Sequence, residues 1–356
     1  MTEYLNSRQL VAKALAGDPI PRPATGPLAV HYCARLAGVS LRQYTTDPRV
    51  LADCVVRYYD RFRPDAVWLS ADTWVTAQAM GAAVAFVSDD QPLGGTGAPA
   101  ICTPADIARL PPPAPASQGR WPLMLEALRR IREALGEAVF LVACFDQYPF
   151  SLACALMGLE QVMLRLVDEP QLVTALMERG LEYGTAYAQA LAAAGADMLS
   201  GGDSPAGLIG PDLYREIALP FERRLIANLK ATTDAFVSLH ICGNATPMLA
   251  DMATSGADVL ELDHQVNLAG ACRLVGPQIG IWGNLDPVAV LARGTPDDVR
   301  RAVGEALGAV TESGHRRFVL SSGCTLAMET PEENLSAMLE AARSVRRSSN
   351  GVLGCQ

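Results

Sequence analysis

Short apolar runs of strand length recur along the chain, and longer segments with helical periodicity separate them. Eight runs have the length and the β-branched content of strands that are buried on both faces. They are residues 27–32, 66–71, 138–145, 196–202, 235–241, 258–263, 279–284 and 317–323. Strands that alternate with helices favour a parallel sheet, so the pattern predicts an α/β protein.

Amphipathic segments lie between these runs, and residues 211–232 and 295–310 are clear examples. The second begins with Thr295 and Pro296, a capping residue followed by proline at the first helical position. Eight strands alternating with helices predict a (β/α)8 TIM barrel, here with an N-terminal helical extension. A doubly wound sheet is the alternative, but no G-x-G-x-x-G motif follows the first strand.

Two stretches interrupt the alternation. Residues 86–120 are rich in glycine and proline, which is typical of an insertion within a domain rather than a linker. Residues 346–356 are polar and are predicted to form a flexible C-terminal tail. We find no internal repeat. The chain is therefore expected to hold one barrel domain over residues 1–345.

Composition excludes several classes of partner. The 356 residues carry a net charge of −9, and lysine and arginine are scattered, which argues against a nucleic-acid binder. The chain has neither an N-terminal secretory pattern nor an apolar run of about 18 residues that would suggest a membrane span. Nine cysteines at irregular spacing do not indicate a disulfide framework. We expect a cytoplasmic protein with reduced thiols and no membrane partner.

Polar residues recur where the predicted strands end. In a TIM barrel the chemistry lies at the C-terminal ends of the strands. The residues at these positions are Asp72, Asp146, Tyr148, Asp203, His240, Cys242, Asp263, His264, Asn284, Asp286 and Cys324. Any single aspartate here could simply open a loop or cap a helix. An imidazole and two thiols on strands five to eight of one ring are harder to explain in this way and leave a metal site open as an alternative, because zinc prefers these ligands.

Several stretches resemble the uroporphyrinogen decarboxylase superfamily over nearly the whole chain. They are "SADTWVTAQAMG" (70–81), "GADMLSGGDSPAGLIGPDLYREIALPFERRLI" (195–226), "GNLDP" (283–287) and "TPEENLSAMLEAAR" (330–343). Two departures separate the chain from true decarboxylases. Their arginine-rich segment corresponds here to "HYCARLAGVS" (31–40), with only Arg35, and Cys324 stands in place of their Gly-His-Gly histidine. A tetrapyrrole with many carboxylates needs several guanidinium partners.

These departures are similar to the zinc-dependent, corrinoid-linked methyltransferases of the superfamily. The resemblance implies zinc ligands at His240, Cys242 and Cys324, and a further carboxylate that matches Asp263, with Glu261 and His264 as neighbours. It implies methyl transfer between a corrinoid (cobalamin) and a small thiol, ether or amine. Three protein ligands and one exchangeable position are typical of catalytic zinc.

The remaining candidates have supporting roles. Asp72, Asp203 and Tyr148 could orient the small substrate or contact the corrinoid, and Asn284 and Asp286 are candidates for cofactor binding. Trp282 and Met328 could form an apolar wall, although packing in the core is the favoured interpretation of both.

The chain lacks a DxHxxG motif for cobalamin, so the corrinoid is expected on a partner protein or as a free cosubstrate. A decarboxylase-like lyase and a non-enzymatic barrel that only binds ligands are the alternatives.

Overall fold

The computed structural model describes residues 5–86, 92–94, 99–347 and 353–354. One eight-stranded parallel sheet forms the centre, in the order β1-β10-β9-β8-β7-β6-β5-β2, which is the order of a barrel. Its strands are β1 (Ala24–Thr25), β2 (Ala66–Leu69), β5 (Phe140–Gln147), β6 (Met198–Gly202), β7 (Phe236–Ile241), β8 (Val259–Leu262), β9 (Gly280–Leu285) and β10 (Phe318–Ser322). A backbone hydrogen bond from Asp65 N to Thr25 O connects the two end strands. The predicted (β/α)8 barrel is confirmed, and the doubly wound alternative is wrong.

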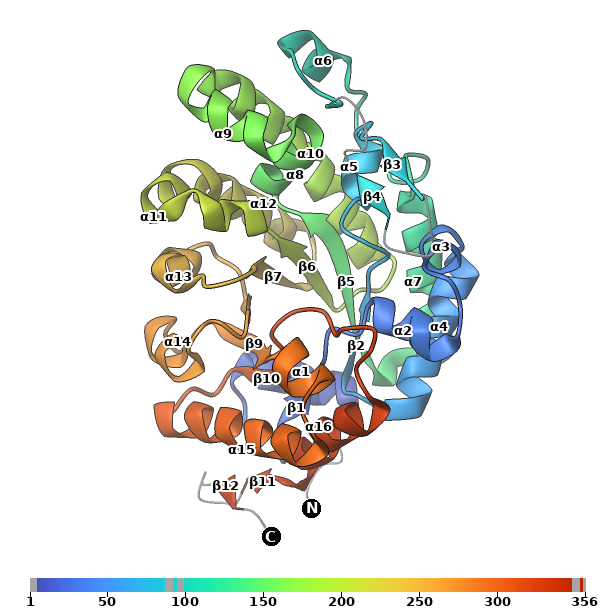
Figure 1. The fold of residues 1–356 in the computed structure, drawn as a ribbon, viewed down its shortest axis with the longest axis vertical. Helices are drawn as coiled ribbons and strands as arrows, with labels where there is room; N and C mark the ends of the chain where they lie inside the picture. The colour runs from blue at the N-terminus through green and yellow to red at the C-terminus, as the bar shows by residue number, and fades with distance from the viewer. Residues whose placement is uncertain (1–4, 87–91, 95–98, 348–352, 355–356) are drawn as a thin grey trace.

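Helices surround the strands (Figure 1). Those that precede or flank β2 and β5 are α1 (Ser7–Ala16), α2 (His31–Ala37), α3 (Leu41–Thr46), α4 (Pro48–Phe62), α5 (Val75–Ala79), α6 (Pro104–Arg109) and α7 (Trp121–Leu135). The later ones are α8 (Pro149–Met157), α9 (Leu159–Asp168), α10 (Pro170–Ala193), α11 (Gly210–Leu213), α12 (Leu219–Thr232), α13 (Leu249–Met252), α14 (Leu268–Leu274), α15 (Pro296–Ser313) and α16 (Glu332–Ser344).

The N-terminal helix closes one end of the barrel. Leu10, Val11, Ala14 and Leu15 of α1 are buried and share a core cluster with residues from the barrel strands, among them Phe140 and Trp282. Burying these four side chains covers apolar surface that an open barrel end would leave in water. The predicted N-terminal extension is thus part of the core, and chemistry is left to the opposite end.

The first predicted strand is wrong in position. Residues 27–32 were expected to form it, but β1 covers only Ala24–Thr25 and α2 begins at His31. Pro27 has no N–H to donate to a sheet, so pairing stops after Gly26, whose N–H still donates to Leu320 O. The apolar run continues because Leu28 and Val30 line a pocket. The other seven predicted strands overlap observed strands.

The predicted helix over 211–232 is interrupted. It is observed as α11, a π-helical turn over Tyr214–Ala218 and then α12. Pro220 removes one backbone donor and cannot approach the carbonyl four residues earlier, so the helix widens there. The second predicted helix is confirmed as α15, with Thr295 as its N-cap in a capping box.

The predicted insertion, 86–120, is described only in part. It contains β4 (Leu93–Gly94), which pairs with β3 (Val84–Ala85), and α6. Most of the predicted tail, 346–356, lies outside the described residues; two short paired strands, β11 (Arg346–Arg347) and β12 (Leu353–Gly354), are described there.

None of the described helices is by itself long and apolar enough to cross a membrane. The pair α8 and α9 meets the length and composition criteria together but is bent by 107°. Its α8 half is mostly buried in the core.

Candidate metal centre

Three predicted ligands meet at the C-terminal end of the barrel. The ligand atoms of His240, Cys242 and Cys324 all lie within 4.8 Å of one another, and His240 Nε2 lies 3.0 Å from Cys242 Sγ. His240 lies in β7, Cys242 directly follows it, and Cys324 follows β10 by two residues. Alternation along β7 turns His240 and Cys242 to the same side. Among the described residues this is the one group of three such donors close enough to hold a metal ion.

A backbone contact fixes the tautomer of His240. Its Nδ1 lies 2.9 Å from Glu261 O, and a carbonyl oxygen can only accept, so Nδ1 carries the hydrogen. When the imidazole is neutral, as metal binding requires, Nε2 presents its lone pair toward the two sulfur atoms. Metal-bound histidines usually have such a second partner, which orients the ring. The donor set therefore fits zinc, which binds imidazole and thiolate well.

The two thiols differ in acidity. The hydrogen bond with Cys324 lowers the pKa of Cys242 to about 7, whereas the same interaction, together with burial, raises the pKa of Cys324. Burial alone would lower the pKa of His240, but hydrogen bonding to Cys324 and the charge of Glu261 raise it to about 9. Without a metal, His240 and Cys324 therefore keep their protons near neutral pH. A bound metal cation would displace these protons.

Glu261 is the buried carboxylate next to this group. It is 4% exposed, lies on β8 opposite His240, and its Oε1 accepts from Ser200 Oγ at 2.7 Å and from Ser238 Oγ. Burial raises the pKa of its carboxyl group. Sequence reasoning named Glu261 only as a neighbour of Asp263. Its signal was an acidic residue within an apolar strand, "VLELD".

Asp263 is not part of this group of three donors and organises loops. Its carboxylate accepts from Gly243 N and Gln265 N, both at 2.9 Å, and its Oδ1 lies 3.0 Å from His264 Nδ1. Asn284 Nδ2 donates to Asp263 O and Val266 O. Asp286 accepts from two N–H groups at the start of the next helical turn. None of Asp263, Asn284 or Asp286 lines the pocket described below, and their proposed roles remain predictions.

Asp72 and Asp146 form the opposite wall. Both carboxylate oxygens of Asp72 pair with Arg120, with Nη2 at 3.0 Å from Oδ1, and Trp74 N also donates to it. Asp146 Oδ2 accepts from Thr76 N at 2.7 Å, while its Oδ1 has no partner among the described residues. Burial, then the charge of Asp72, raises the pKa of Asp146 to about 7. Sequence reasoning missed Arg120, which ends the predicted insertion and carries no motif.

Asp203 and Tyr148 are buried behind the pocket. Asp203 Oδ1 accepts from Ser151 N and Ser151 Oγ, its Oδ2 has no hydrogen-bond partner among the described residues, and the carboxyl group of Glu222 lies nearby. Burial raises the pKa of Asp203 to about 6. Tyr148 donates to Ser238 O at 2.8 Å and is fully buried. Neither side chain lines the pocket, so their direct roles remain predictions.

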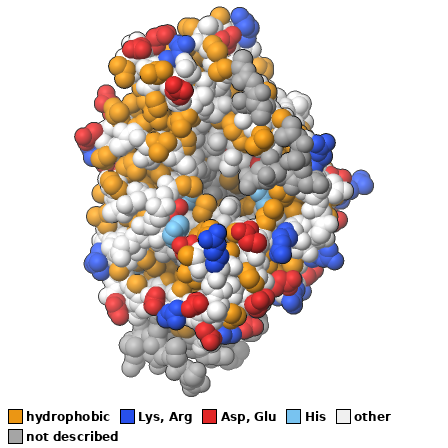
Figure 2. All heavy atoms as spheres, in the orientation of Figure 1, with side chains coloured by type: hydrophobic (Ala, Val, Ile, Leu, Met, Phe, Trp, Pro, Cys, Tyr) orange, Lys and Arg blue, Asp and Glu red, His pale blue; other side chains and the backbone are white. Residues whose placement is uncertain are grey.

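These residues surround one cavity of about 350 Å³ at the mouth of the barrel. It connects the three ligands on one side with Asp72 and Asp146 on the other. It is lined by Leu28, Val30, His31, Trp68, Ser70, Asp72, Thr73, Cys144, Asp146, Gln147, Ser151, Ser200, Gly201, Gly202, Ser204, Pro205, His240, Cys242, Glu261, Cys324 and Thr325. Figure 2 shows this face hollowed near its centre, with histidine side chains close by. Trp282 and Met328 do not line it, and Trp282 is buried in the barrel core.

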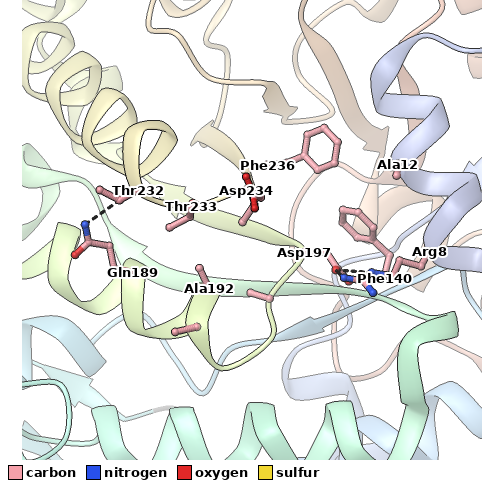
Figure 3. A pocket seen from close by; sticks show the side chains of 13 residues that line it. Arg8, Ala12, Phe140, Gln189, Ala192, Asp197, Thr232, Thr233, Asp234 and Phe236 are labelled. Carbon is pink, nitrogen blue, oxygen red and sulfur yellow. Dashed lines mark hydrogen bonds and ion pairs between the residues drawn. The ribbon is translucent and has the colours of Figure 1, made fainter.

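A second hollow, of about 540 Å³, lies at the other end of the barrel (Figure 3). Residues that begin strands line it, including Phe140 and Phe236, beside Arg8 of α1. Its Asp197 is paired with Arg8, as the dashed line in the figure shows, and with Arg132. Its buried charge is neutralised within the fold, and the candidate metal donors found among the described residues lie at the other end, although this hollow is larger.

The geometry thus defines a class: a TIM barrel whose mouth combines a zinc-type donor set with a small enclosed pocket. Comparison with known proteins agrees. The family model for uroporphyrinogen decarboxylase (URO-D) matches residues 6–345, and the chain belongs to this family. A solved "methyltransferase from Methanosarcina mazei" superposes with a TM-score of 0.85 at 26% identity, covering 96% of this chain and 99% of that one.

Curated relatives point to two activities within the family. The methylcobamide:CoM methyltransferase MtaA of Methanosarcina barkeri is 26% identical, over 96% of this chain and 98% of its own. MtbA of Methanosarcina acetivorans is 34% identical over 65% of this chain, and the match spans 66% of MtbA. A uroporphyrinogen decarboxylase of Alkalilimnicola ehrlichii is 30% identical over 84% of this chain and 81% of its own. The resemblance to the methyltransferase branch seen in the sequence is confirmed.

Proposed function

We propose that this protein is a zinc-dependent methyltransferase that moves a methyl group between a corrinoid and a small substrate. The observation that carries the proposal is the convergence of His240, Cys242 and Cys324 at the barrel mouth. The similarity to methylcobamide:CoM methyltransferases over nearly the whole chain supports it. Bound there, zinc would stabilise a substrate thiol as the thiolate or polarise the leaving atom of a methyl donor.

The chain's own residues would prepare the site for this chemistry. Glu261 O holds the Nδ1 hydrogen of His240, so that Nε2 keeps a lone pair for the metal. The Glu261 carboxylate lines the same pocket as the three ligands, and its charge acts on His240. Apolar lining by Leu28, Val30 and Trp68 excludes water from the reacting atoms, which strengthens electrostatic interactions inside the pocket.

The corrinoid is proposed to arrive on a partner protein that docks over the barrel mouth. Leu208 and Leu213 follow β6, and Val288 follows β9, so all three lie on the mouth side. Their exposed fractions are 68%, 44% and 41%. Exposed apolar residues around a pocket are typical of a protein–protein contact. Docking would orient the two reactants, which a free cofactor would have to achieve by diffusion.

The decarboxylase alternative is supported by relatives such as the one from Alkalilimnicola ehrlichii, but the pocket disfavours it. Among the described residues that line the pocket there is no lysine or arginine. A tetrapyrrole carrying many carboxylates requires several such partners. We expect no stepwise loss of carboxyl groups from uroporphyrinogen, and detectable decarboxylation would favour the lyase.

The test of the main proposal is an absorbance assay with the zinc-loaded protein. Cob(I)alamin is mixed with a panel of methyl ethers, methylamines and methyl thioethers, and methylcobalamin with thiols. We expect one donor or acceptor to interconvert the two corrinoid spectra. The Cys242→Ala protein is the matched control and should be inactive. If no compound changes the spectrum, the methyltransferase proposal fails and the non-enzymatic alternative gains support.

A further inference from the structure

Within the described part of the chain, the mouth pocket is lined by acidic side chains and by no lysine or arginine, whereas an anionic substrate needs positively charged partners. Coenzyme M, which the curated relatives are named for, combines a thiol with a sulfonate. A sulfonate is normally bound by arginine, lysine or free backbone N–H groups. This pocket instead holds the carboxyl groups of Asp72, Asp146 and Glu261.

The nearest guanidinium is already neutralised. Arg120 directs both terminal nitrogens to Asp72, its Nε to Gln78 Oε1 at 2.6 Å, and Nη1 also to Thr45 O. It is 8% exposed and does not line the pocket. The undescribed segments 87–91 and 95–98 contain no lysine or arginine in their sequence, and Asp89 and Asp90 are acidic.

Three of the backbone donors at the mouth are also used. Trp74 N donates to Asp72, Thr76 N to Asp146, and Ser151 N to Asp203, at 2.7 to 2.9 Å. Pro149, the first residue of α8, has no N–H. The chain's own carboxylates therefore occupy the positions that an anionic ligand would use at these helix starts.

One of these carboxylates still has an oxygen atom available to accept an interaction from a ligand. Asp146 is 3% exposed and lines the pocket across from the metal ligands, and its Oδ1 has no partner among the described residues. An unpaired buried carboxylate oxygen is costly, and an incoming cation would relieve that cost.

We propose that the small substrate is a thiol, or its methyl thioether, whose other end carries a positive charge that Asp146 recognises. This inference rests on the proposed function, because the sulfur end must meet the metal group. It assigns the sulfur to the His240, Cys242 and Cys324 side and the cation to the Asp146 side. An anionic thiol such as coenzyme M is then a poor ligand.

Two thiols of nearly equal shape test the proposal. In 2-(trimethylammonio)ethanethiol a tetrahedral cation replaces the tetrahedral sulfonate of coenzyme M, and its quaternary nitrogen cannot bind a metal. Titration calorimetry with the zinc-loaded full-length protein measures both affinities. We expect the cationic thiol to bind at least about tenfold more tightly, with neutral 2-mercaptoethanol between the two.

The Asp146→Asn variant tests whether Asp146 causes the preference for the cationic thiol. Its amide oxygen can still accept from Thr76 N, so only the charge is lost, and the preference for the cationic thiol should fall about tenfold. Asp168→Asn, an exposed residue at the end of α9, makes the same charge change and should alter neither affinity. An unchanged preference in Asp146→Asn would overturn the role of Asp146.

The wild-type result is decisive by itself, even if the variant does not fold. Equal or tighter binding of coenzyme M would overturn the inference and leave the methyltransferase proposal standing. If neither thiol binds while the zinc is fully loaded, the inference and a thiol-dependent function both fail.

Discussion

The two ends of the barrel use the same residue types in opposite ways. At the N-terminal end, Asp65, Asp197 and Asp258 each come directly before a strand. Each accepts from a backbone N–H at the start of the neighbouring strand, namely that of Thr25, Leu141 or Val237. Each also pairs with a cation, Arg22, Arg132 or Lys230, at 2.6 to 2.7 Å. These carboxylates tie strands together.

At the mouth, by contrast, burial disfavours the charged form of the acidic side chains. Burial raises the pKa of Asp146, Asp203 and Glu261, and the three candidate metal ligands have donor atoms within 4.8 Å of one another. Groups of this kind cluster at functional sites, because the fold must supply the free energy that holds them there. The comparison separates carboxylates that stabilise the barrel from those available to a ligand.

The largest expected effect comes from removing a thiol at the mouth. Cys242→Ala or Cys324→Ala takes away one of three protein ligands, so zinc content should fall from about one per chain to a small fraction of that. Elemental analysis of the purified proteins measures it. Cys102→Ala, which removes an exposed thiol elsewhere, is the control and should keep its metal. Full occupancy in both site variants would refute the ligand assignment.

At the opposite end the loss should appear in stability and not in metal content. Asp197→Ala removes the carboxylate that pairs with Arg132 and leaves the N–H of Leu141 without its acceptor in a buried position, which should lower the free energy of unfolding by about 3 kcal/mol. Urea unfolding measures the change. Asp234→Ala, an exposed residue lining the same hollow, should have little effect. A stable Asp197→Ala protein that loses zinc would contradict the division between the two ends.

Asp146 should make stability depend on pH. Its pKa is about 7 in the fold, against a usual value of 3.8, so the folded state binds its proton more tightly than the unfolded state. Asp146 therefore has no effect below about pH 4 and destabilises the fold progressively as the pH rises to 7. Asp72 and Arg120 face it and are the other charged groups in its surroundings.

The Asp146→Asn variant isolates this contribution. Relative to wild type, its free energy of unfolding should be higher at pH 8 than at pH 5 by about 1–3 kcal/mol. Urea midpoints at the two pH values give the difference. The opposite sign would mean that the carboxylate is stabilised as an anion, and the unpaired Oδ1 would then need another explanation.

The smallest effect concerns the rim of the mouth. Leu208→Ser should weaken functional docking of a corrinoid protein, seen as a severalfold higher KM for that protein, with stability within about 0.5 kcal/mol of wild type. Leu274→Ser is the matched control: it is also exposed, at 50%, but ends α14 at the other end of the barrel. Equal effects of both substitutions would argue against docking over the mouth.

The amino-acid sequence by itself determined the barrel and the candidate metal donors. The length of the apolar runs, and the helical periodicity of the segments between them, identified seven of the eight strands, because buried parallel strands must be continuously apolar. His240, Cys242 and Cys324 could be found because their residue types are chemically distinctive and each follows a strand. The position of β1 could not be found from the sequence, since the apolar residues Leu28 and Val30 line a pocket but give the same pattern as a buried strand.

Only the tertiary structure decided which polar residues are free to act. Asp72 and Asp146 look alike in sequence, but Arg120, 48 residues away from Asp72, neutralises only the first. Asp263 lies at a strand end as expected, yet its oxygens are used by Gly243 N and Gln265 N, and Glu261 lines the pocket instead. Hydrogen bonds between residues distant in sequence depend on three-dimensional proximity. A residue type reveals which chemistry is possible, and its partners decide whether that chemistry is available.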